Sequence, residues 1–326
     1  MRAIRCEAFG PPGEVVLRNL PDPVARPGEV VVRVEGAALN FPDVLLVQNK
    51  YQLTMTLPYT PGSEFAGTVL SLGADVTAFR VGDRVMGSGI SGAFAEQVAV
   101  PATRLRPVPA GLDSLSAAAF QVTFRTGYHA LTTIGGLQSG RWVVVLGAAG
   151  GVGSACVDIA SRLGARVIAA GNRPDSLDSC RELGAEAVID YGTEDLKARI
   201  KEITGDGADL VIDPVGGAYS EQALRATAWG GRFVVIGFAS GDIPRIPLNL
   251  VLLKGVILRG FEIRTLPHLL PDAYAEGEKK LAELVAEGLR PKISAVYPLE
   301  RTGEALTAMA ERRVSGKVVI APQWGT

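Results

Sequence analysis

The hydrophobic and polar positions fall into two patterns that change over near residue 122. Before this point, short apolar runs alternate with glycine and proline turns, which is typical of small β-strands. This pattern predicts a β-rich region that forms a partly open barrel or a sandwich. The runs that indicate strands are 29–39, 64–73, 82–87 and 94–100.

The second pattern alternates short apolar runs with amphipathic segments. The run WVVVL at 142–146 has no polar position, as expected for a parallel strand that is covered on both faces. Such alternation predicts an α/β fold with a doubly wound parallel sheet. The segment after the first run places apolar residues on one helix face: Val152, Ala155, Cys156, Ile159, Ala160 and Leu163. Further strands are predicted at 165–170, 187–190, 208–213 and 232–237, and helices at 175–184, 193–204 and 218–228.

The end of the chain returns to a mixed pattern. Helices are predicted near 276–287 and 302–313, and strands at 293–297 and 316–321. We expect this tail to pack on the β-rich region. The predicted domains are therefore residues 1–121, completed by 265–326, and residues 122–264, which hold the parallel sheet.

Composition and charge exclude several classes of partner. The 326 residues carry a net charge of −1 without a basic stripe, which argues against nucleic acid. No apolar run reaches the roughly 18 residues of a membrane span, and the first residues lack the apolar core of a signal peptide. We therefore expect a cytoplasmic protein without a membrane partner. The widely spaced Cys6, Cys156 and Cys180 fit a reducing compartment, and we expect the last two to serve packing.

A glycine-rich stretch, GAAGGVG at 147–153, joins the first apolar strand to the amphipathic helix. A strand, a glycine turn and a helix N-terminus form a cradle for a dinucleotide pyrophosphate, because backbone N–H groups point at the ligand. The glycines are spaced three apart, so the loop is one residue longer than G-x-G-x-x-G. A glycine turn without a ligand is the alternative. The cradle residues are Gly147, Gly150, Gly151, Val152 and Gly153.

The end of the second strand of this sheet distinguishes NADH from NADPH. Sites for NAD place an acidic residue there, which binds the ribose 2′-hydroxyl. The sequence AAGNRPDS at 169–176 instead offers Asn172 and Arg173, and a guanidinium suits a 2′-phosphate. We therefore expect NADPH as cofactor. A solvated loop charge at Arg173 is the alternative, which the nearby Asp175 keeps open.

Several stretches together give the chain a resemblance to a known family. It resembles the medium-chain dehydrogenase/reductase superfamily, in its quinone oxidoreductase (zeta-crystallin-like) branch. The resemblance covers essentially the whole chain and implies a GroES-like β-rich catalytic domain beside a Rossmann domain that binds NADP. The stretches that carry it are GAALNFPDVLLVQNKYQ (36–52), PGSEFAGTV (61–69), VGDRV (81–85), GAAGGVGSA (147–155), DPVGG (213–217), GGRFVVIGFASG (230–241) and SGKVVI (315–320).

The resemblance also raises the question of a metal. Zinc alcohol dehydrogenases of the superfamily carry a Cys where Asn40 stands and a His where Ser63 stands, and only the acidic residue at Glu64 is kept. They often have a lobe of four closely spaced cysteines, which this chain lacks. Catalytic zinc needs three nitrogen, sulfur or oxygen ligands from the protein. We therefore expect a site without zinc or another metal.

Chemistry without zinc suits an acceptor that is already electrophilic. Hydride transfer from NADPH to a quinone or an α,β-unsaturated carbonyl needs only placed hydrogen-bond donors for the developing oxyanion. The resemblance implies the same activity, NADPH:quinone reduction. Two alternatives stay open. One is reduction of an enoyl thioester or another activated alkene, and the other is NADPH binding without catalysis.

Three residues are candidate donors in catalysis. Asn40 offers an amide to the substrate or to the nicotinamide ribose, or it forms a structural turn bond with the help of Asp43. Tyr51 offers a phenol as proton donor, or it only lines the pocket. Thr123 matches a position where the family contacts the nicotinamide, as does Thr126, although both fit helix-cap hydroxyls as well. Arg125 is a candidate substrate anchor.

The resemblance extends to further cofactor contacts. Tyr191 and Arg173 would flank the 2′-phosphate, although Ser176 stands where the family often has a lysine. Lys317 would reach the pyrophosphate or a ribose, with a surface lysine as the alternative. The segment 256–263 is a candidate edge strand that pairs across a two-fold axis in a homodimer. Residues expected beside the nicotinamide are Asn40, Thr123, Thr126, Gly237, Phe238 and Ser240.

Overall fold

The computed structural model describes residues 1–323, and the chain divides into two compact units. The first unit holds Met1–Val122 and the residues from Val285 on, and the second unit holds Thr123–Leu284. The first boundary lies one residue from the predicted one. The second boundary differs, because residues 265–284 cluster with the second unit and not with the β-rich one.

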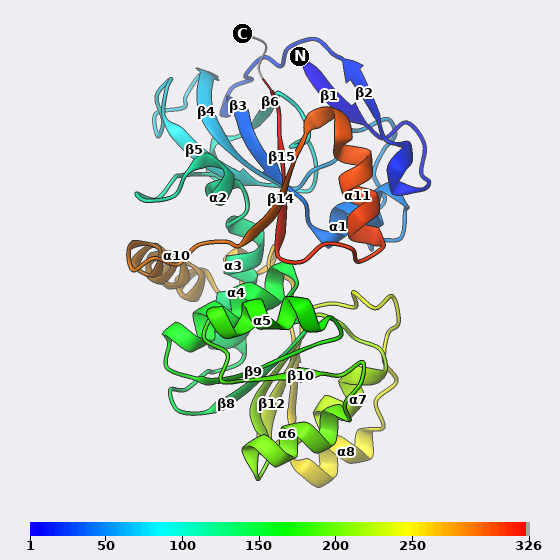
Figure 1. Cartoon of the computed structure of the whole chain (residues 1–326). Coiled ribbons are helices and arrows are strands. Elements are labelled where there is room, and N and C mark those ends of the chain that lie inside the picture. The colour runs from blue at the N-terminus through cyan, green and yellow to red at the C-terminus, as the bar shows by residue number, and fades with distance from the viewer. Residues whose placement is uncertain (324–326) are drawn as a thin grey trace. The chain divides into compact units, whose positions relative to one another are not determined.

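The first unit is built on a mixed sheet and a separate hairpin (Figure 1). The sheet order is β14-β15-β3-β4-β5-β7, and β6 pairs with β3. β14 and β15 run parallel, and the other pairs named here are antiparallel. The strands are β1 (Arg2–Arg5), β2 (Val16–Asn19), β3 (Glu29–Ala38), β4 (Glu64–Leu72), β5 (Arg84–Ser88), β6 (Gln97–Pro101), β7 (Leu105–Pro107), β14 (Ile293–Pro298) and β15 (Lys317–Ala321), and the helices are α1 (Phe41–Val47), α2 (Ser114–Ala118) and α11 (Thr302–Ala310).

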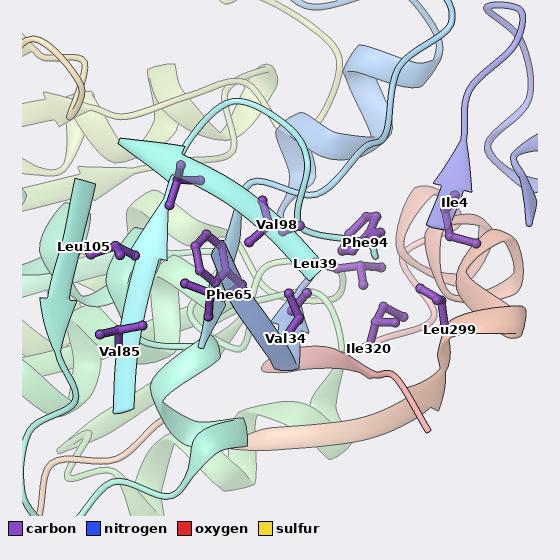
Figure 2. Packing of buried hydrophobic residues seen from close by; sticks show 14 of the residues in the cluster. Ile4, Val34, Leu39, Phe65, Val85, Phe94, Val98, Leu105, Leu299 and Ile320 are labelled. Atoms are coloured by element: carbon purple, nitrogen blue, oxygen red, sulfur yellow. The ribbon is translucent and has the colours of Figure 1, made fainter. Parts of the chain in front are cut away.

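A large hydrophobic cluster fills much of the interior of this unit (Figure 2). Its large side chains come from elements far apart in the sequence, so the cluster joins the beginning of the chain to its end. Phe65 and Phe94 pack there with Leu105, Leu299 and Ile320, and all five are nearly free of solvent contact. Burial of this apolar area supplies the main stabilisation of the β-rich unit.

The second unit is a six-stranded, fully parallel sheet. Its order is β10-β9-β8-β11-β12-β13, so the chain starts in the middle and winds outward in both directions. This is the doubly wound order of dinucleotide-binding sheets. The predicted fold class is therefore confirmed. The strands are β8 (Trp142–Leu146), β9 (Arg166–Gly171), β10 (Ala187–Asp190), β11 (Ala208–Asp213), β12 (Thr227–Val235) and β13 (Ile257–Gly260).

Helices cover both faces of the parallel sheet (Figure 1). One layer contains α4 (Gly151–Arg162) and α5 (Pro174–Glu182), and the other contains α6 (Leu196–Thr204), α7 (Ala218–Arg225) and α8 (Leu248–Lys254). Because water is excluded from both faces, every residue of β8 is buried, as its apolar sequence predicts. Within residues 1–323, no helix is long and apolar enough to cross a membrane.

In the second unit, the short helix α9 (Leu266–Leu269) precedes α10 (Pro271–Ala286), and α10 packs against α3 (Gln121–His129). The Arg125 guanidinium donates two hydrogen bonds of 2.7 Å to the Glu278 carboxylate. The His129 ring stacks on Tyr274, with 5.5 Å between centroids. Gly277 leaves room for that ring, since a Cβ there would lie 2.5 Å from its Cε1. These contacts explain why residues 265–284 do not join the β-rich unit.

Candidate functional site

The glycine loop follows β8 at the carboxyl end of the sheet, and two of its positions admit only glycine. Gly147 has a φ of +57°, and a Cβ there would lie 2.7 Å from the Val215 side chain. A Cβ on Gly153 would lie 2.2 Å from the Gly147 carbonyl oxygen. The loop therefore brings the start of α4 against its own backbone, the close approach that a dinucleotide cradle uses.

The N-terminus of α4 presents uncapped backbone donors. Gly150 is the N-cap residue and has no side chain that could accept from the first turn. The N–H groups of Gly151, Val152 and Gly153 belong to that turn, where the helix dipole favours an anion. These residues fit the pyrophosphate of a dinucleotide, because donors and dipole point to one place.

The loop after β11 lies against the glycine loop, and the loop after β12 packs on the loop after β11. The loop after β11 reaches it through Val215, whose side chain lies against Gly147. The Val215 carbonyl accepts a hydrogen bond of 2.8 Å from the Ser240 N–H in the loop after β12. The Phe238 ring lies over Gly216, where a Cβ would come within 2.9 Å of it. The structure thus joins Phe238 and Ser240 to the loop after β11, which itself lies against the glycine loop.

Asp213 holds the loop after β11 in shape. Its carboxylate accepts from the N–H groups of Val215 and Gly216, at 2.8 and 2.9 Å, and from the Ser220 hydroxyl. Burial raises the pKa of this carboxyl, and the three hydrogen bonds oppose that rise. The sequence DPVGG therefore encodes a closed turn that supports the loop carrying Ser240.

The predicted ribose end of the site lies after β9 and β10, which are neighbours in the sheet. Asn172 and Arg173 follow β9 and are exposed, with Arg173 at the N-cap position of α5. Tyr191 follows β10, donates its N–H to the Gly171 carbonyl at 2.9 Å, and packs its ring on Tyr219. No carboxylate occupies the tip of β9, so the surroundings suit a 2′-phosphate better than a free 2′-hydroxyl.

Thr123 and Thr126 are buried at the third and sixth residues of α3, so neither is an N-cap residue. Their helix lies against α4, because a Cβ on Gly127 would be 3.3 Å from the Cys156 sulfur. Cys156 itself is buried and free, in keeping with a packing role. Both threonines therefore lie on a helix that is fixed to the helix of the cradle.

In the first unit, Asn40 is committed to structural hydrogen bonds. It caps α1, its N–H donates to Asp43 Oδ2 at 2.8 Å, and the two residues form a capping box. Its amide Nδ2 donates to Glu64 Oε1 at 2.9 Å and to Ser63 Oγ at 3.2 Å. With both amide hydrogens used, this arrangement favours the structural alternative. Tyr51 is half-buried and follows α1 in the chain.

The hydrogen-bonded side chains of Asn40, Asp43, Ser63 and Glu64 form what we call the Asn40 cluster. The ammonium of Lys317 lies at its centre. It donates to Glu64 Oε1 at 2.7 Å, to Asn40 Oδ1 at 2.8 Å and to the Leu39 carbonyl at 2.9 Å. These bonds use all three donors of the ammonium, and the residue is 2% exposed. The surface-lysine alternative is therefore wrong. Contact with a pyrophosphate remains a prediction that requires the ammonium to leave its acceptors.

Among residues 1–323, the buried Asp43 Oδ1 has no hydrogen-bond partner. The buried Tyr59 side chain packs beside Cys6. Burial raises the pKa of the Asp43 carboxyl to about 7, and its hydrogen bonds to Asn40 and Ser63 oppose that rise. Burial also raises the pKa of the Tyr59 phenol. Sequence reasoning selects Tyr51 in this segment and misses Tyr59, which has no motif around it that indicates burial.

Comparison with known proteins agrees with this geometry. The model of the alcohol dehydrogenase GroES-like domain matches residues 26–110, and that of the zinc-binding dehydrogenase matches residues 151–279. A quinone oxidoreductase-like protein 2 homolog of Nematostella vectensis is 37% identical over 324 residues, which cover 98% of this chain and 88% of that protein. The chain belongs to the quinone oxidoreductase branch of the medium-chain dehydrogenase/reductase superfamily.

Solved members of this oxidoreductase family share the fold. The quinone oxidoreductase of Thermus thermophilus, studied alone and with NADPH, has a TM-score of 0.85 and 35% identity, over 98% of this chain and all of that one. The Escherichia coli quinone oxidoreductase in complex with NADPH has a TM-score of 0.91 and 26% identity, over 99% of this chain and all of that one.

The donor set of this family member does not fit a catalytic zinc ion. Asn40 and Ser63 offer a neutral amide and a hydroxyl, and Glu64 already accepts from the Lys317 ammonium. Catalytic zinc sites use three ligands among His, Cys and acidic side chains, and an ammonium adds repulsion. In the described residues 1–323, no three such side chains form a group that could hold a metal ion.

Sequence reasoning misses the two buried ion pairs. Arg125 binds Glu278, so in this structure it is an anchor for α10 and not a free substrate anchor. Lys317 binds Glu64, 253 positions away in the chain. Neither pair has local spacing that reveals it. A weak signal does exist for Lys317, since it begins an otherwise apolar strand, KVVIA.

Proposed function

We propose that this protein is an NADPH-dependent reductase that transfers hydride to a quinone or an α,β-unsaturated carbonyl without zinc. The observation that carries the proposal is the convergence of three loops at the start of α4, with glycine at the two positions where any Cβ would collide. The solved relatives with NADPH support the choice of cofactor.

In this proposal the second unit binds the cofactor. The first-turn N–H groups of α4 hold the pyrophosphate. Arg173 binds the 2′-phosphate, flanked by Asn172 and Tyr191. The nicotinamide is bordered by residues from two loops and one helix, namely Thr123, Thr126, Gly237, Phe238 and Ser240.

The bound cofactor supplies hydride, and the chain supplies hydrogen-bond donors to the acceptor oxygen. A quinone or an enone is electrophilic without a metal, so neutral donors suffice to stabilise the charge that develops on oxygen. Because the Asn40 amide hydrogens are already used, we assign this part to the Tyr51 phenol and the Thr123 hydroxyl. Asn40 then serves to shape α1.

The test is NADPH consumption by purified, chelator-treated protein, with an ortho-quinone and an enone compared side by side. We expect turnover that added zinc does not raise. The better acceptor selects between quinone reduction and reduction of activated alkenes, including enoyl thioesters. NADPH binding with no turnover on either acceptor would contradict the reductase and favour a binding protein.

The choice of NADPH is tested separately with Arg173→Ala. Loss of a charge-assisted contact to the 2′-phosphate should raise the KM for NADPH about tenfold or more, with little change for NADH. The control is Arg181→Ala, which removes an exposed arginine of the same helix α5 that pairs with Asp178. Equal effects of Arg173→Ala on both cofactors would remove the assigned role.

We also propose a cytoplasmic homodimer. β13 lies at the end of the parallel sheet, and Ile257 and Leu258 on it are exposed, as are Leu252 and Leu253 on α8. A second copy would cover this apolar edge. The three cysteines are free, which suits a reducing compartment. A monomeric mass in sedimentation at micromolar concentration would overturn the dimer.

A further inference from the structure

The first unit contains a cation site built from oxygen atoms. Glu64 Oε1, Asn40 Oδ1 and the Leu39 carbonyl lie within 2.9 Å of one point, which the Lys317 nitrogen occupies. The side chains of Glu64 and Lys317 are 0% and 3% exposed. Carboxylate, amide and carbonyl oxygens are the ligands that hard metal cations prefer. An ammonium group thus stands where a metal cation would.

We propose that the ammonium of Lys317 is a built-in cation that replaces a metal in this site and closes the site to metal ions. This goes beyond the proposed reductase, because it explains how the chain keeps a fully buried carboxylate at Glu64 without a metal. A carboxylate at Glu64 without a counter-charge would be very costly in this interior.

The register of the mixed sheet delivers the lysine to this place. β15 pairs with β3 so that Val319 lies opposite Ala38. Just past the end of β3, the Leu39 N–H donates to the Val318 carbonyl at 2.9 Å, which brings the chain at Leu39 and Asn40 to Lys317. β3 pairs with β4 so that Ala38 lies opposite Glu64. The cation and its acceptors therefore come from β15, from β4 and from the two residues that directly follow β3.

The built-in cation also organises its surroundings. With Lys317 on its Oδ1, the Asn40 amide turns its hydrogens to Glu64 and Ser63. The second oxygen of Glu64 accepts from the N–H of Val122, at 2.9 Å, in the first turn of α3. Lys317 is thus a positioning residue, which fixes the cap of α1 and the beginning of α3.

In the first experiment, Lys317→Ala removes the ammonium, and binding of an added cation in its place is measured. The probes are Mn²⁺ and propylammonium, each added to chelator-treated protein, and the readouts are the melting temperature and the bound Mn²⁺ per chain. We expect Lys317→Ala to melt several degrees below wild type, to recover with either probe, and to bind about one Mn²⁺. Wild type and the exposed-lysine control Lys279→Ala should not respond.

A second pair of variants decides the matter if Lys317→Ala does not fold. Lys317→Met leaves Glu64 without its cation, whereas Lys317→Met with Glu64→Gln removes both charges. We expect the double variant to melt at a higher temperature than the single one. A double variant no more stable than Lys317→Met would overturn the proposal. So would a folded Lys317→Ala protein without any cation response, or wild-type protein that binds one Zn²⁺ or Mn²⁺ and loses it on Glu64→Gln.

Discussion

Each unit of the molecule buries one ion pair between distant parts of the chain, and the two pairs differ in how completely water is excluded. The side chains of Lys317 and Glu64 are 3% and 0% exposed, whereas those of Arg125 and Glu278 are 9% and 24% exposed. Water can reach a partner left alone in the second pair but not in the first. Loss of either partner of the first pair would therefore leave a buried charge without compensation. The second pair mainly holds α10 against α3.

The largest effect is expected from Glu64→Gln. The variant keeps the shape of the side chain but leaves the Lys317 ammonium without a counter-charge, so we expect a loss of about 3–5 kcal/mol in the free energy of unfolding. Urea denaturation at 25 °C measures it. The control is Glu283→Gln, which alters an exposed carboxylate paired with Lys280. A loss of unfolding free energy no larger than that of the control would mean that burial does not make the Lys317–Glu64 pair more costly to break than an exposed pair.

His129 lies beside the Arg125 pair and Asp43 beside the Lys317 pair, so the pH dependence of stability offers a second comparison of the two surroundings. Burial lowers the pKa of His129, which lies next to the Arg125 pair, to about 4, and Arg125 acts in the same direction while Glu278 opposes it. The folded protein then binds fewer protons than the unfolded chain between pH 6.5 and 4. The contribution of His129 to the free energy of unfolding is fully present above pH 6.5 and falls as the pH drops, by up to about 3 kcal/mol.

His129→Phe tests this pH dependence, because phenylalanine keeps a ring against Tyr274 but binds no proton. We expect the variant to lose less stability than wild type between pH 7 and pH 4.5 in urea denaturation. Identical losses would mean that the imidazole is not buried in its neutral form. Asp43 in the other cluster should act oppositely, since a pKa raised to about 7 makes stability fall as the pH rises from 3.8 through 7.

The sequence predicts the glycine loop and its neighbours well, and it fails for the two buried ion pairs. The glycine loop, the strand before it and the helix after it follow each other within a few residues, so local pattern determines their relation, and β8 and α4 match the predicted segments closely. The order of the parallel sheet agrees with the alternation of strands and helices. Loop convergence at Val215 follows from that order, because neighbouring parallel strands end at one edge.

The buried pairs depend instead on contacts across the whole chain. The sequence places Lys317 at a pyrophosphate or on the surface, because a lysine side chain gives no sign of the register that takes it to Glu64. Sequence reasoning places residues 265–284 with the β-rich unit. The amphipathic pattern of α10 predicts a helix but does not indicate which element that helix packs against. Only packing against Arg125 and His129 assigns this helix to the second unit.

A smaller effect is expected from Glu278→Gln than from Glu64→Gln. The Arg125 guanidinium would lose a bidentate carboxylate but keep a neutral acceptor and the nearby Tyr274 ring. Partial access of water lowers the cost, so we expect a loss of about 1–2 kcal/mol. Urea denaturation beside Glu64→Gln gives the ratio. A loss equal to that of Glu64→Gln would show that residual exposure at Glu278 does not matter.

The smallest loss of stability is expected at an ion pair on the surface, which serves as the exposed case for comparison with the two buried pairs. Arg301 and Glu304 form an ion pair three residues apart at the start of α11, and their side chains are 57% and 50% exposed. Water and salt screen such a pair, and ordering two long side chains offsets the attraction. We expect Glu304→Gln to leave the melting temperature unchanged within error, at low and at high salt. A measurable drop that disappears in salt would show that attraction across exposed charges contributes here, and burial alone would then not rank the three pairs.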